Sequence, residues 1–536
     1  MSGKQRIPVT VPIQPHLADH RFEGKAVFPA VEALQLLARI VEERHPGVEV
    51  RFSRDARFLR FLQVPVDADA FDAIVELEPR PEEQVVARLL TQVRAGGTGM
   101  ARLLEHAVVT FGRAPSSGCA GSQEYLEPAS CLAAPLGPGL CIRSTDLYGA
   151  MVPFGPAYHN ARDPIVLTRD GASGRVVCPD LPYPRGPLGS PFPLDAAFHI
   201  ACGWGERHVG AVLFPVGYES RTIFRPNEPG GHCFCRVMPR PLGSEVPAAT
   251  ALFDLWIFDR EAALREICFG VRMEDVSRGR FVPPDWGLWK GDDPLEPLRA
   301  DVAGLVVLEL SSVLPPLARA TLTPGEKALA EGLGERRQPS FIAGRVALKR
   351  LARCIAEGPL PDDSQLHTIQ EDGIRPICPL GASDQTSRSI RPPLHPLLQQ
   401  GREEQAFPRF ASLAHDRRFA IAVAAERPVG VDVEPVTDKA LRGARLFLSR
   451  DERRRVEADP SGPDHAATRL WTVKEAVAKA LNVRLPKAWH AVEAVELLPE
   501  STRLRIDGAQ HVARHAECDG HLFTTLLLPG ASESNP

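Results

Sequence analysis

Two carboxylates in the C-terminal third of the chain have the spacing of a shared cation site. They lie in the segment Val429-Gly430-Val431-Asp432-Val433-Glu434. Small apolar residues alternate there with Gly430, Asp432 and Glu434, which is the period of a strand with one face on the core. Asp432 and Glu434 therefore project to the same side, where they can bind one cation together.

A later segment adds a third carboxylate and two ammonium groups. It reads Trp471-Thr472-Val473-Lys474-Glu475-Ala476-Val477-Ala478-Lys479. The segment contains neither Gly nor Pro and predicts a helix, on which Glu475 and Lys479 share a face and Lys474 lies beside them. Three carboxylates and nearby lysines suit a Mg²⁺ ion that keeps some waters and binds phosphate oxygens, so the implied ligand is a pyrophosphate. Each segment alone is also typical of a polar strand edge or of an ordinary solvated helix.

Together and in this order, the two segments resemble the signature of Sfp-type 4′-phosphopantetheinyl transferases. These enzymes move the phosphopantetheine arm of coenzyme A onto a serine of a carrier protein. The resemblance implies that Asp432, Glu434 and Glu475 ligate Mg²⁺ and that Glu475 accepts the proton of the attacking serine. Lys479 and Lys474 are then expected to stabilise the departing 3′,5′-ADP side.

The resemblance extends over residues 304–530 and includes a coenzyme A site. Arg337 and Arg345 look like the arginines that begin this site, although they also fit the face of a basic amphipathic helix. Where the family has Gly-Lys-Pro, this sequence has Gly373-Ile374-Arg375-Pro376, with one extra residue and Arg in place of Lys. The resemblance implies that Arg375 contacts a phosphate. His415 matches the family histidine near the 3′-phosphate, and Ala414 replaces a common serine.

Length and charge bound the remaining possibilities. The chain has 536 residues, which is too long for one core, and its formal net charge of −4 is spread along the sequence. Neither a nucleic-acid footprint nor a basic membrane patch is indicated. No apolar stretch approaches the length of a membrane span, the N-terminus lacks the hydrophobic segment of a signal peptide, and 11 scattered cysteines indicate no disulfide framework. The sequence predicts a cytoplasmic protein.

A proline cluster and an insertion predict the domain organisation. The cluster at 282–297 separates two regions of different pattern. We expect a first domain at 1–288 with halves of about 1–135 and 140–288, a linker at 289–303, and a second domain at 304–530. Residues 379–408 lack a sustained period and predict a loop inserted into the second domain.

The N-terminal half predicts one long helix against an antiparallel sheet, and then the same arrangement again. Pro29 is well placed to open a helix over 30–41, in which apolar residues recur at the spacing of a buried stripe. Runs with strand character follow, without the alternation of parallel βαβ units. A second proline-opened helix at 193–202 precedes strands around 214–216, 233–237 and 251–258. Two similar halves of α+β type are expected.

This arrangement resembles the double-hotdog dehydratase domain of polyketide synthases. The first half of that family carries His-x-x-x-Gly-x-x-x-x-Pro, which matches His20, Gly24 and Pro29. The second half carries Asp-x-x-x-Gln/His, which matches Asp195 and His199. The fold class implied for the whole chain is α+β, a double hotdog followed by a pseudo-duplicated transferase fold.

Two side chains of different type could perform the dehydration. Neutral histidine can take a proton at pH 7, and a carboxylic acid in an apolar pocket can stay protonated long enough to donate one. By the resemblance, His20 removes the α-proton of a 3-hydroxyacyl thioester, and Asp195, oriented by His199, protonates the departing hydroxyl. A backbone N–H near Gly155 is expected to polarise the thioester carbonyl. Phe154 stands where many dehydratases have tyrosine, so that hydroxyl is absent.

From the residues alone, a helix-entry histidine and an N-terminal helix acid explain His20 and Asp195 equally well. The two domains together leave three hypotheses for the function.

The first hypothesis is a bifunctional enzyme that uses coenzyme A, an acyl carrier protein and its acyl thioester. In the second, only the transferase is active and the hotdog half is a silent carrier-docking or acyl-binding module. In the third, the hotdog half hydrolyses thioesters. Dehydratases of this kind often pair, so a homodimer through the hotdog half is one expectation, and the oligomeric state stays open.

Overall fold

The chain divides into two compact units. The computed structural model describes residues 3–65, 67–94, 101–112, 127–181, 186–241, 249–289, 291, 293–356, 358–368 and 410–529. Unit 1 consists of Met1–Leu126 and Gly139–Trp289, and unit 2 of Glu127–Pro138 and Lys290–Pro536. Among the helices in the described ranges, none combines the length and the apolar character that a membrane span requires.

Unit 1 contains two long helices and a set of antiparallel strands. Its elements are β1 (Gln5–Pro12), β2 (Arg21–Phe22), β3 (Lys25–Ala26), α1 (Ala30–Arg44), β4 (Phe52–Phe58), β5 (Ala70–Arg80), β6 (Gln84–Arg94), β7 (Ala101–Phe111), β8 (Leu140–Ile142), α3 (Ser144–Asp146), a π-helical turn (Leu147–Met151), β9 (Ala161–Thr168), β10 (Gly171–Val177), α4 (Phe192–His208), β11 (Phe214–Ile223), β12 (His232–Arg240), β13 (Thr250–Asp259) and β14 (Leu264–Glu274). Short 3₁₀ turns lie at Pro15–Asp19 and Pro156–Tyr158.

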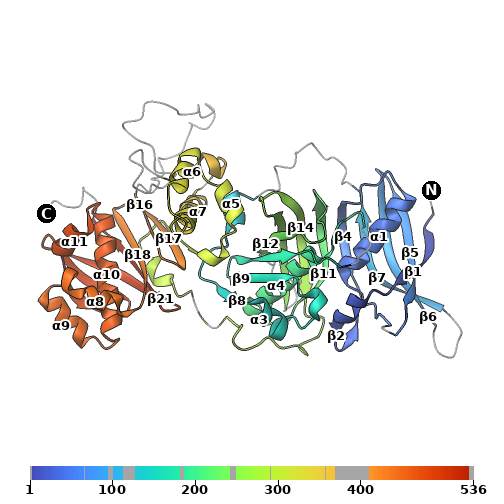
Figure 1. Ribbon diagram of the computed structural model, residues 1–536, viewed down its shortest axis with the longest axis horizontal. Helices are drawn as coiled ribbons and strands as arrows, with labels where there is room; N and C mark the ends of the chain where they lie inside the picture. The colour runs from blue at the N-terminus through green and yellow to red at the C-terminus, as the bar shows by residue number, and fades with distance from the viewer. Residues whose placement is uncertain are drawn as a thin grey trace, which may run out of the picture. The chain divides into compact units, whose positions relative to one another are not determined.

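The two helices of unit 1 each pack against one half of a continuous sheet (Figure 1). In the described ranges this sheet has 12 strands in the order β1-β5-β6-β7-β4-β11-β14-β13-β12-β10-β9-β8. The helix α1 contacts β5, β6 and β7, and α4 contacts β9 to β13. Pairing of β4 with β11 joins the two halves. The predicted double hotdog is therefore confirmed for unit 1.

Apolar stripes explain why these two helices are central. On α1, Leu34, Leu37 and Val41 are fully buried, as the spacing of the stripe predicts. On α4, the buried face includes Leu194 and Ala197. Both helices begin beside a proline, and Pro29 is the residue that precedes α1.

Unit 2 consists of two α+β halves. Its elements are α2 (Ala129–Ala133), a 3₁₀ turn (Glu296–Leu298), β15 (Gly304–Glu309), a 3₁₀ turn (Leu310–Ser312), α5 (Pro315–Ala320), α6 (Pro324–Glu331), α7 (Gln338–Ile355), a 3₁₀ turn (Asp363–Gln365), β16 (Phe410–His415), β17 (Phe419–Ala425), β18 (Val429–Pro435), α8 (Asp438–Phe447), α9 (Arg450–Ala458), α10 (Pro463–Ala480), α11 (Leu485–Ala491), β19 (Val492–Leu497), β20 (Ser501–Ile506), β21 (Ala509–Cys518) and β22 (His521–Leu527). The strand order is β15-β17-β16 in one sheet and β18-β22-β21-β20-β19 in the other.

Each half of unit 2 has its own long helix. The helix α7 packs against β15, β16 and β17, and α10 packs against β18 and β22. The strands β16 and β18 also contact each other, which brings the two halves together. This arrangement of paired helix and sheet agrees with the expected pseudo-duplication.

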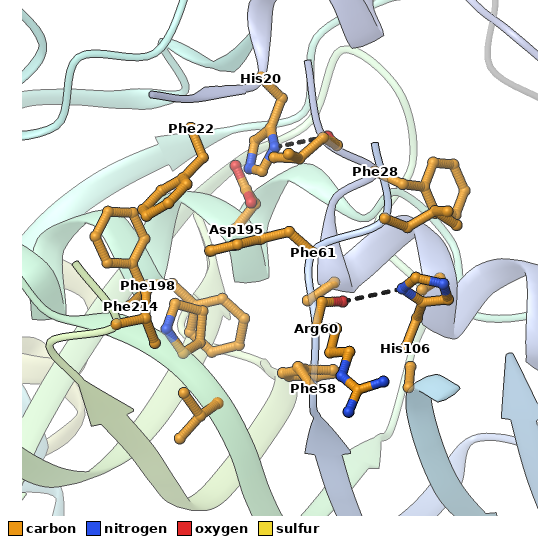
Figure 2. Close-up of a pocket in the computed structure, with 18 of the residues that line it drawn as sticks. His20, Phe22, Phe28, Phe58, Arg60, Phe61, His106, Asp195, Phe198 and Phe214 are labelled. Atoms are coloured by element: carbon orange, nitrogen blue, oxygen red, sulfur yellow. Dashed lines mark hydrogen bonds between the residues drawn. The ribbon is translucent and has the colours of Figure 1, made fainter. Parts of the chain in front are cut away.

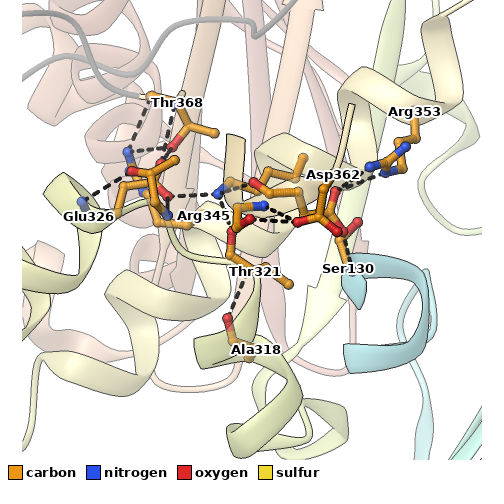
Figure 3. A network of polar contacts seen from close by, with 12 residues as sticks. Ser130, Ala318, Thr321, Glu326, Arg345, Arg353, Asp362 and Thr368 are labelled. Atoms are coloured by element: carbon orange, nitrogen blue, oxygen red, sulfur yellow. Dashed lines mark hydrogen bonds and ion pairs between the residues drawn. The ribbon is translucent and has the colours of Figure 1, made fainter. Parts of the chain in front are cut away.

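A buried polar network connects residues 127–138 to unit 2 (Figure 3). The sequence pattern predicted instead that the first hotdog half extends over about 1–135. The backbone N–H of Ser130 donates to Oδ2 of Asp363 at 2.6 Å. Arg353 donates to the other oxygen of the same carboxylate at 2.8 Å. Lys349 is fully buried and donates to Glu326 at 2.7 Å and to the carbonyl of Asp363 at 2.9 Å. These contacts join segments distant in sequence, so local patterns gave no sign of them.

The segment 289–303, which was predicted to be a linker, also contributes to unit 2. Leu295 and Leu298 are buried in the core of unit 2 with Phe419 and Val431. Proline content indicated a linker, but these two leucines give the segment apolar surface to bury. The predicted insertion at 379–408 lies outside the described residues.

Candidate functional site

The three predicted metal ligands meet where α10 packs against β18. Asp432 and Glu434 project from β18, and Glu475 lies on α10. Gly430 makes this approach possible, because a Cβ atom there would overlap the carbonyl oxygen of Ala476. A glycine inside a strand pattern is a signal of close backbone approach, so the sequence carries a sign of this role of Gly430 beside the signs of the acids.

The acids and one lysine form a compact cluster. One oxygen each from Asp432, Glu434 and Glu475 lies within 4.8 Å of the others. Asp432 is buried, and the other two acids are half-buried. Lys479 donates to Oδ1 of Asp432 at 2.8 Å and to the carbonyl of Val431 at 2.9 Å, and its Nζ lies 3.9 Å from Glu475. The structure thus brings these four side chains together.

The electrostatics of this cluster fit a divalent cation. Burial raises the pKa of Asp432 to about 8; Glu475 adds to this rise and Lys479 opposes it. Burial also raises the pKa of Glu434, whose carboxylate accepts a hydrogen bond from the Trp471 indole at 3.3 Å. Oδ2 of Asp432 is buried and has no hydrogen-bond partner among the described residues. A Mg²⁺ ion would satisfy this oxygen and neutralise the clustered carboxylates, so the residues present fit it.

Lys474 does not belong to this cluster, and its assignment as a phosphate contact was wrong. Its side chain is 1% exposed and donates to Glu452 at 2.9 Å and to the carbonyls of Phe447 and Trp489. Adjacent helix residues point about 100° apart, so Glu475 and Lys474 cannot face the same site. Lys474 holds α10 to the elements that pack against its other face.

Arg345 is a buried cation that has no ion pair with a carboxylate among the described residues. It lies on α7, is 7% exposed, and donates through Nη1 to Thr368 at 3.3 and 3.4 Å. Its Nε has no partner within the described ranges. Burial lowers the pKa of Arg345 to about 10. A buried guanidinium with an unused donor suits an anionic ligand such as a phosphate.

His415 is the last residue of β16, and the positively charged Lys479 and Arg345 act on its ring. Partial desolvation lowers the pKa of His415, and the positive charges of Lys479 and Arg345 lower it further. The Lys479 ammonium and the Arg345 guanidinium therefore both lie near enough to act on the His415 ring. Arg337 immediately precedes α7, and its side chain is exposed. Arg375 lies outside the described residues.

The segment that carries the acid cluster matches a known protein family. Residues 428–523 match the 4′-phosphopantetheinyl transferase superfamily. The transferase-superfamily segment begins just before β18 and ends within β22, so it contains Asp432, Glu434, Glu475 and Lys479. No curated protein matches the sequence.

Unit 1 contains a second candidate site, an apolar cavity of about 280 Å³ (Figure 2). Figure 2 shows the ring of His20 and the carboxyl group of Asp195 pointing into this cavity from opposite halves of the unit. Aromatic side chains make up much of its wall: Phe22, Phe28, Phe58, Phe61, Phe154, Phe198 and Phe214. The cavity is suited to an apolar chain.

His20 is arranged as a base. Its Nδ1–H donates to the carbonyl of Val27 at 3.0 Å, which leaves Nε2 as the nitrogen with a free lone pair. The ring stacks on Phe154 with 4.4 Å between centroids. Burial lowers the pKa of His20 to about 4, so the imidazole is neutral at pH 7.

Asp195 is arranged as an acid. It lies in the first turn of α4 and is 5% exposed. Burial raises the pKa of Asp195 well above its ordinary value, and the negative charge of Glu32 raises it further. Its Oδ2 lies 3.3 Å from Nε2 of His199, one turn later on α4. A protonated carboxyl can donate the proton that a leaving hydroxyl needs.

The expected donor to a thioester carbonyl is not the N–H of Gly155. That N–H donates to the carbonyl of Asp19 at 2.7 Å, and the N–H of Ala157 donates to the Asp19 carboxylate at 2.9 Å. Both donors are therefore used within the protein. Phe154 fills the place of the absent tyrosine and packs between His20 and His199.

Solved dehydratase domains are similar to this chain over 51% of its length. The dehydratase domain of the polyketide PpsC from Mycobacterium tuberculosis is 17% identical, with 92% of that chain covered and a TM-score of 0.38. The domain from the CurJ module of curacin polyketide synthase is 14% identical, with 92% covered and a TM-score of 0.39. An N-terminal dehydratase from the difficidin assembly line is 13% identical, with 93% covered and a TM-score of 0.37.

Proposed function

We propose that the chain is a bifunctional carrier-protein enzyme. Unit 2 transfers 4′-phosphopantetheine from coenzyme A to a serine of an acyl carrier protein, with Mg²⁺ as cofactor. Unit 1 dehydrates a 3-hydroxyacyl thioester on the carrier to the trans-2-enoyl thioester. The observation that carries the proposal is the meeting of Asp432, Glu434 and Glu475 within 4.8 Å inside the segment that matches the transferase superfamily.

In the transferase, the side chains bind and orient the reactants. Mg²⁺ held by Asp432, Glu434 and Glu475 would supply charge neutralisation at the pyrophosphate. The half-buried Glu475 carboxylate accepts the proton of the carrier serine. Lys479 offers positive charge to the phosphates of coenzyme A, His415 offers a ring N–H donor, and the buried Arg345 offers its Nε–H, unpaired among the described residues. The products are the holo-carrier and adenosine 3′,5′-bisphosphate.

In the dehydratase, proton transfer runs between two groups with opposite pKa shifts. Nε2 of His20 takes the α-proton of the thioester, and the electron pair forms the new double bond. The bond to the β-hydroxyl breaks as Asp195 gives that oxygen a proton, and water leaves. The aromatic wall excludes bulk water, which stabilises the neutral forms of both residues.

Two observations support a catalytically silent unit 1. The N–H of Gly155 is already bonded to Asp19, and Phe154 lacks the hydroxyl of many dehydratases. Incubation of the full chain with a 3-hydroxyacyl thioester separates the hypotheses, since enoyl absorbance indicates dehydration and free acid indicates hydrolysis. Absence of both products would favour a carrier-docking or acyl-binding module.

Reciprocal variants test the two activities in one protein. Glu475→Gln should stop phosphopantetheinylation of an apo-carrier and leave enoyl formation unchanged. Asp195→Asn should do the reverse, because the two sites lie in separate units. Loss of both activities in either variant would contradict this division of labour.

A further inference from the structure

Tyr148 makes more polar contacts than a packing residue requires. It lies in the π-helical turn of unit 1 and is 5% exposed. Its hydroxyl oxygen accepts hydrogen bonds from the backbone N–H groups of Asn160 at 3.0 Å and Ala161 at 2.8 Å. The same oxygen lies 3.3 Å from Nδ1 of His199.

These contacts fix the direction of the tyrosine proton. A phenol oxygen has two lone pairs and one hydrogen, and the two backbone N–H groups use both lone pairs. The hydroxyl hydrogen is therefore left for Nδ1 of His199, which must accept it. His199 is buried and its pKa is lowered well below the ordinary value by burial, with further lowering by His20 and His159, so its ring is neutral. A neutral ring that accepts at Nδ1 carries its own proton on Nε2.

The proton on Nε2 faces Asp195. Nε2 lies 3.3 Å from Oδ2 of Asp195, an oxygen that has no hydrogen-bond partner of good geometry among the described residues. Catalytic contacts of this length tighten when a substrate binds. With Oδ2 as the acceptor from His199, the proton of the neutral Asp195 carboxyl must be carried by Oδ1.

We infer that Tyr148 is a positioning residue, which selects the Nε2–H tautomer of His199 and so fixes which oxygen of Asp195 carries the acid proton. The inference deepens the dehydratase activity proposed above, and its kinetic consequence rests on that activity. The tautomer itself does not, so it can be tested separately.

The tautomer is measured by ¹⁵N NMR of the full chain labelled at histidine, with His199 identified as the signal lost in His199→Gln. The expected result is a neutral ring protonated at Nε2, which shifts toward the Nδ1–H form in Tyr148→Phe. Tyr218→Phe is the matched control, because Tyr218 is buried in the same unit and bonds Ser53 at 2.8 Å instead. A wild-type His199 protonated at Nδ1, or a tautomer unchanged by Tyr148→Phe, overturns the inference.

Kinetics separate this role from packing. Tyr148→Phe should lower kcat for enoyl formation roughly tenfold or more, a part of what a placed general acid contributes. In the His199→Gln background the same change should lower kcat much less, because a glutamine amide offers an N–H donor whatever the hydroxyl does. Equal losses in both backgrounds would show a packing effect only and would overturn the positioning role. If the wild-type chain forms no enoyl product while His199 has the expected tautomer, the proposed dehydratase fails and the inference about Tyr148 stands.

Discussion

A Cβ atom on Gly430 would overlap the carbonyl oxygen of Ala476, so α10 lies directly on the backbone of β18. Glu475 is the neighbour of Ala476, and Asp432 follows Gly430 by two residues on the same face of the strand. This contact of backbone with backbone brings acids from a strand and a helix within 4.8 Å. The meeting of these carboxylates therefore depends on the missing side chain at Gly430.

The first prediction follows from that contact. Gly430→Ala should push α10 away from β18, destabilise the fold by about 1–3 kcal/mol, and lower phosphopantetheine transfer roughly 100-fold. Gly443→Ala is the matched control, since a Cβ atom there meets nothing within 4 Å. Gly443 lies inside α8, so this change should stabilise the protein by about 0.5–1 kcal/mol. Urea unfolding and transfer rates measure both, and a Gly430→Ala variant with normal transfer would refute the positioning argument.

The second prediction separates the two lysines of α10. Lys474→Met should cost about 3–5 kcal/mol of stability, because it leaves the buried Glu452 carboxylate without its cation. Lys479→Met should lower transfer with a smaller effect on unfolding, since the Lys479 side chain is 30% exposed. If Lys474→Met left stability unchanged and weakened coenzyme A binding, Lys474 would have to be restored to the phosphate site.

These two lysines also show how far the sequence could predict the site. The strand period and the helical run predicted the elements that carry Asp432, Glu434 and Glu475, because local periodicity determines which residues share a face. The apolar stripes likewise predicted α1 and α4. Local periodicity cannot determine which polar face of α10 meets solvent, since both faces carry a lysine. That choice is made by Glu452, which is distant in sequence from Lys474.

The same limit applies to residues 127–138 and to Tyr148. Ser130 joins unit 2 through the carboxylate of Asp363, and Tyr148 acts through backbone groups of a loop and through a histidine on α4. No periodic pattern encodes such tertiary contacts. Proline density misassigned 289–303 for a related reason, since composition alone does not show that Leu295 and Leu298 are buried.

The third prediction concerns the 3′-phosphate of coenzyme A. His415→Ala should raise KM for coenzyme A roughly tenfold, because a charge-assisted hydrogen bond is lost, and should leave KM for 3′-dephospho-coenzyme A unchanged. His490→Ala, an exposed histidine on α11, is the control and should change neither value. Equal increases for both substrates would place His415 away from the 3′-phosphate.

The fourth prediction is the pH dependence of enoyl formation. Below about pH 4 the His20 imidazole is protonated and cannot act as a base, so kcat/KM should fall only there. Asp195 must keep its proton to act as an acid, and its raised pKa places the alkaline limb well above the ordinary range of a carboxyl group. Glu32→Gln removes a negative charge that raises this pKa, so the alkaline limb should move to lower pH. An acid limb near the ordinary histidine pKa of about 6.5 would contradict the lowered pKa of the buried His20.

The most direct test of the account is the intact mass of an apo-acyl carrier protein after incubation with the full chain and coenzyme A. With Mg²⁺ present, the carrier should gain the mass of one phosphopantetheine group. Chelation by EDTA should prevent the gain, and added Mg²⁺ should restore it. A carrier that stays unmodified with Mg²⁺, or one that is modified equally in EDTA, would contradict the claim that Asp432, Glu434 and Glu475 hold a catalytic divalent cation.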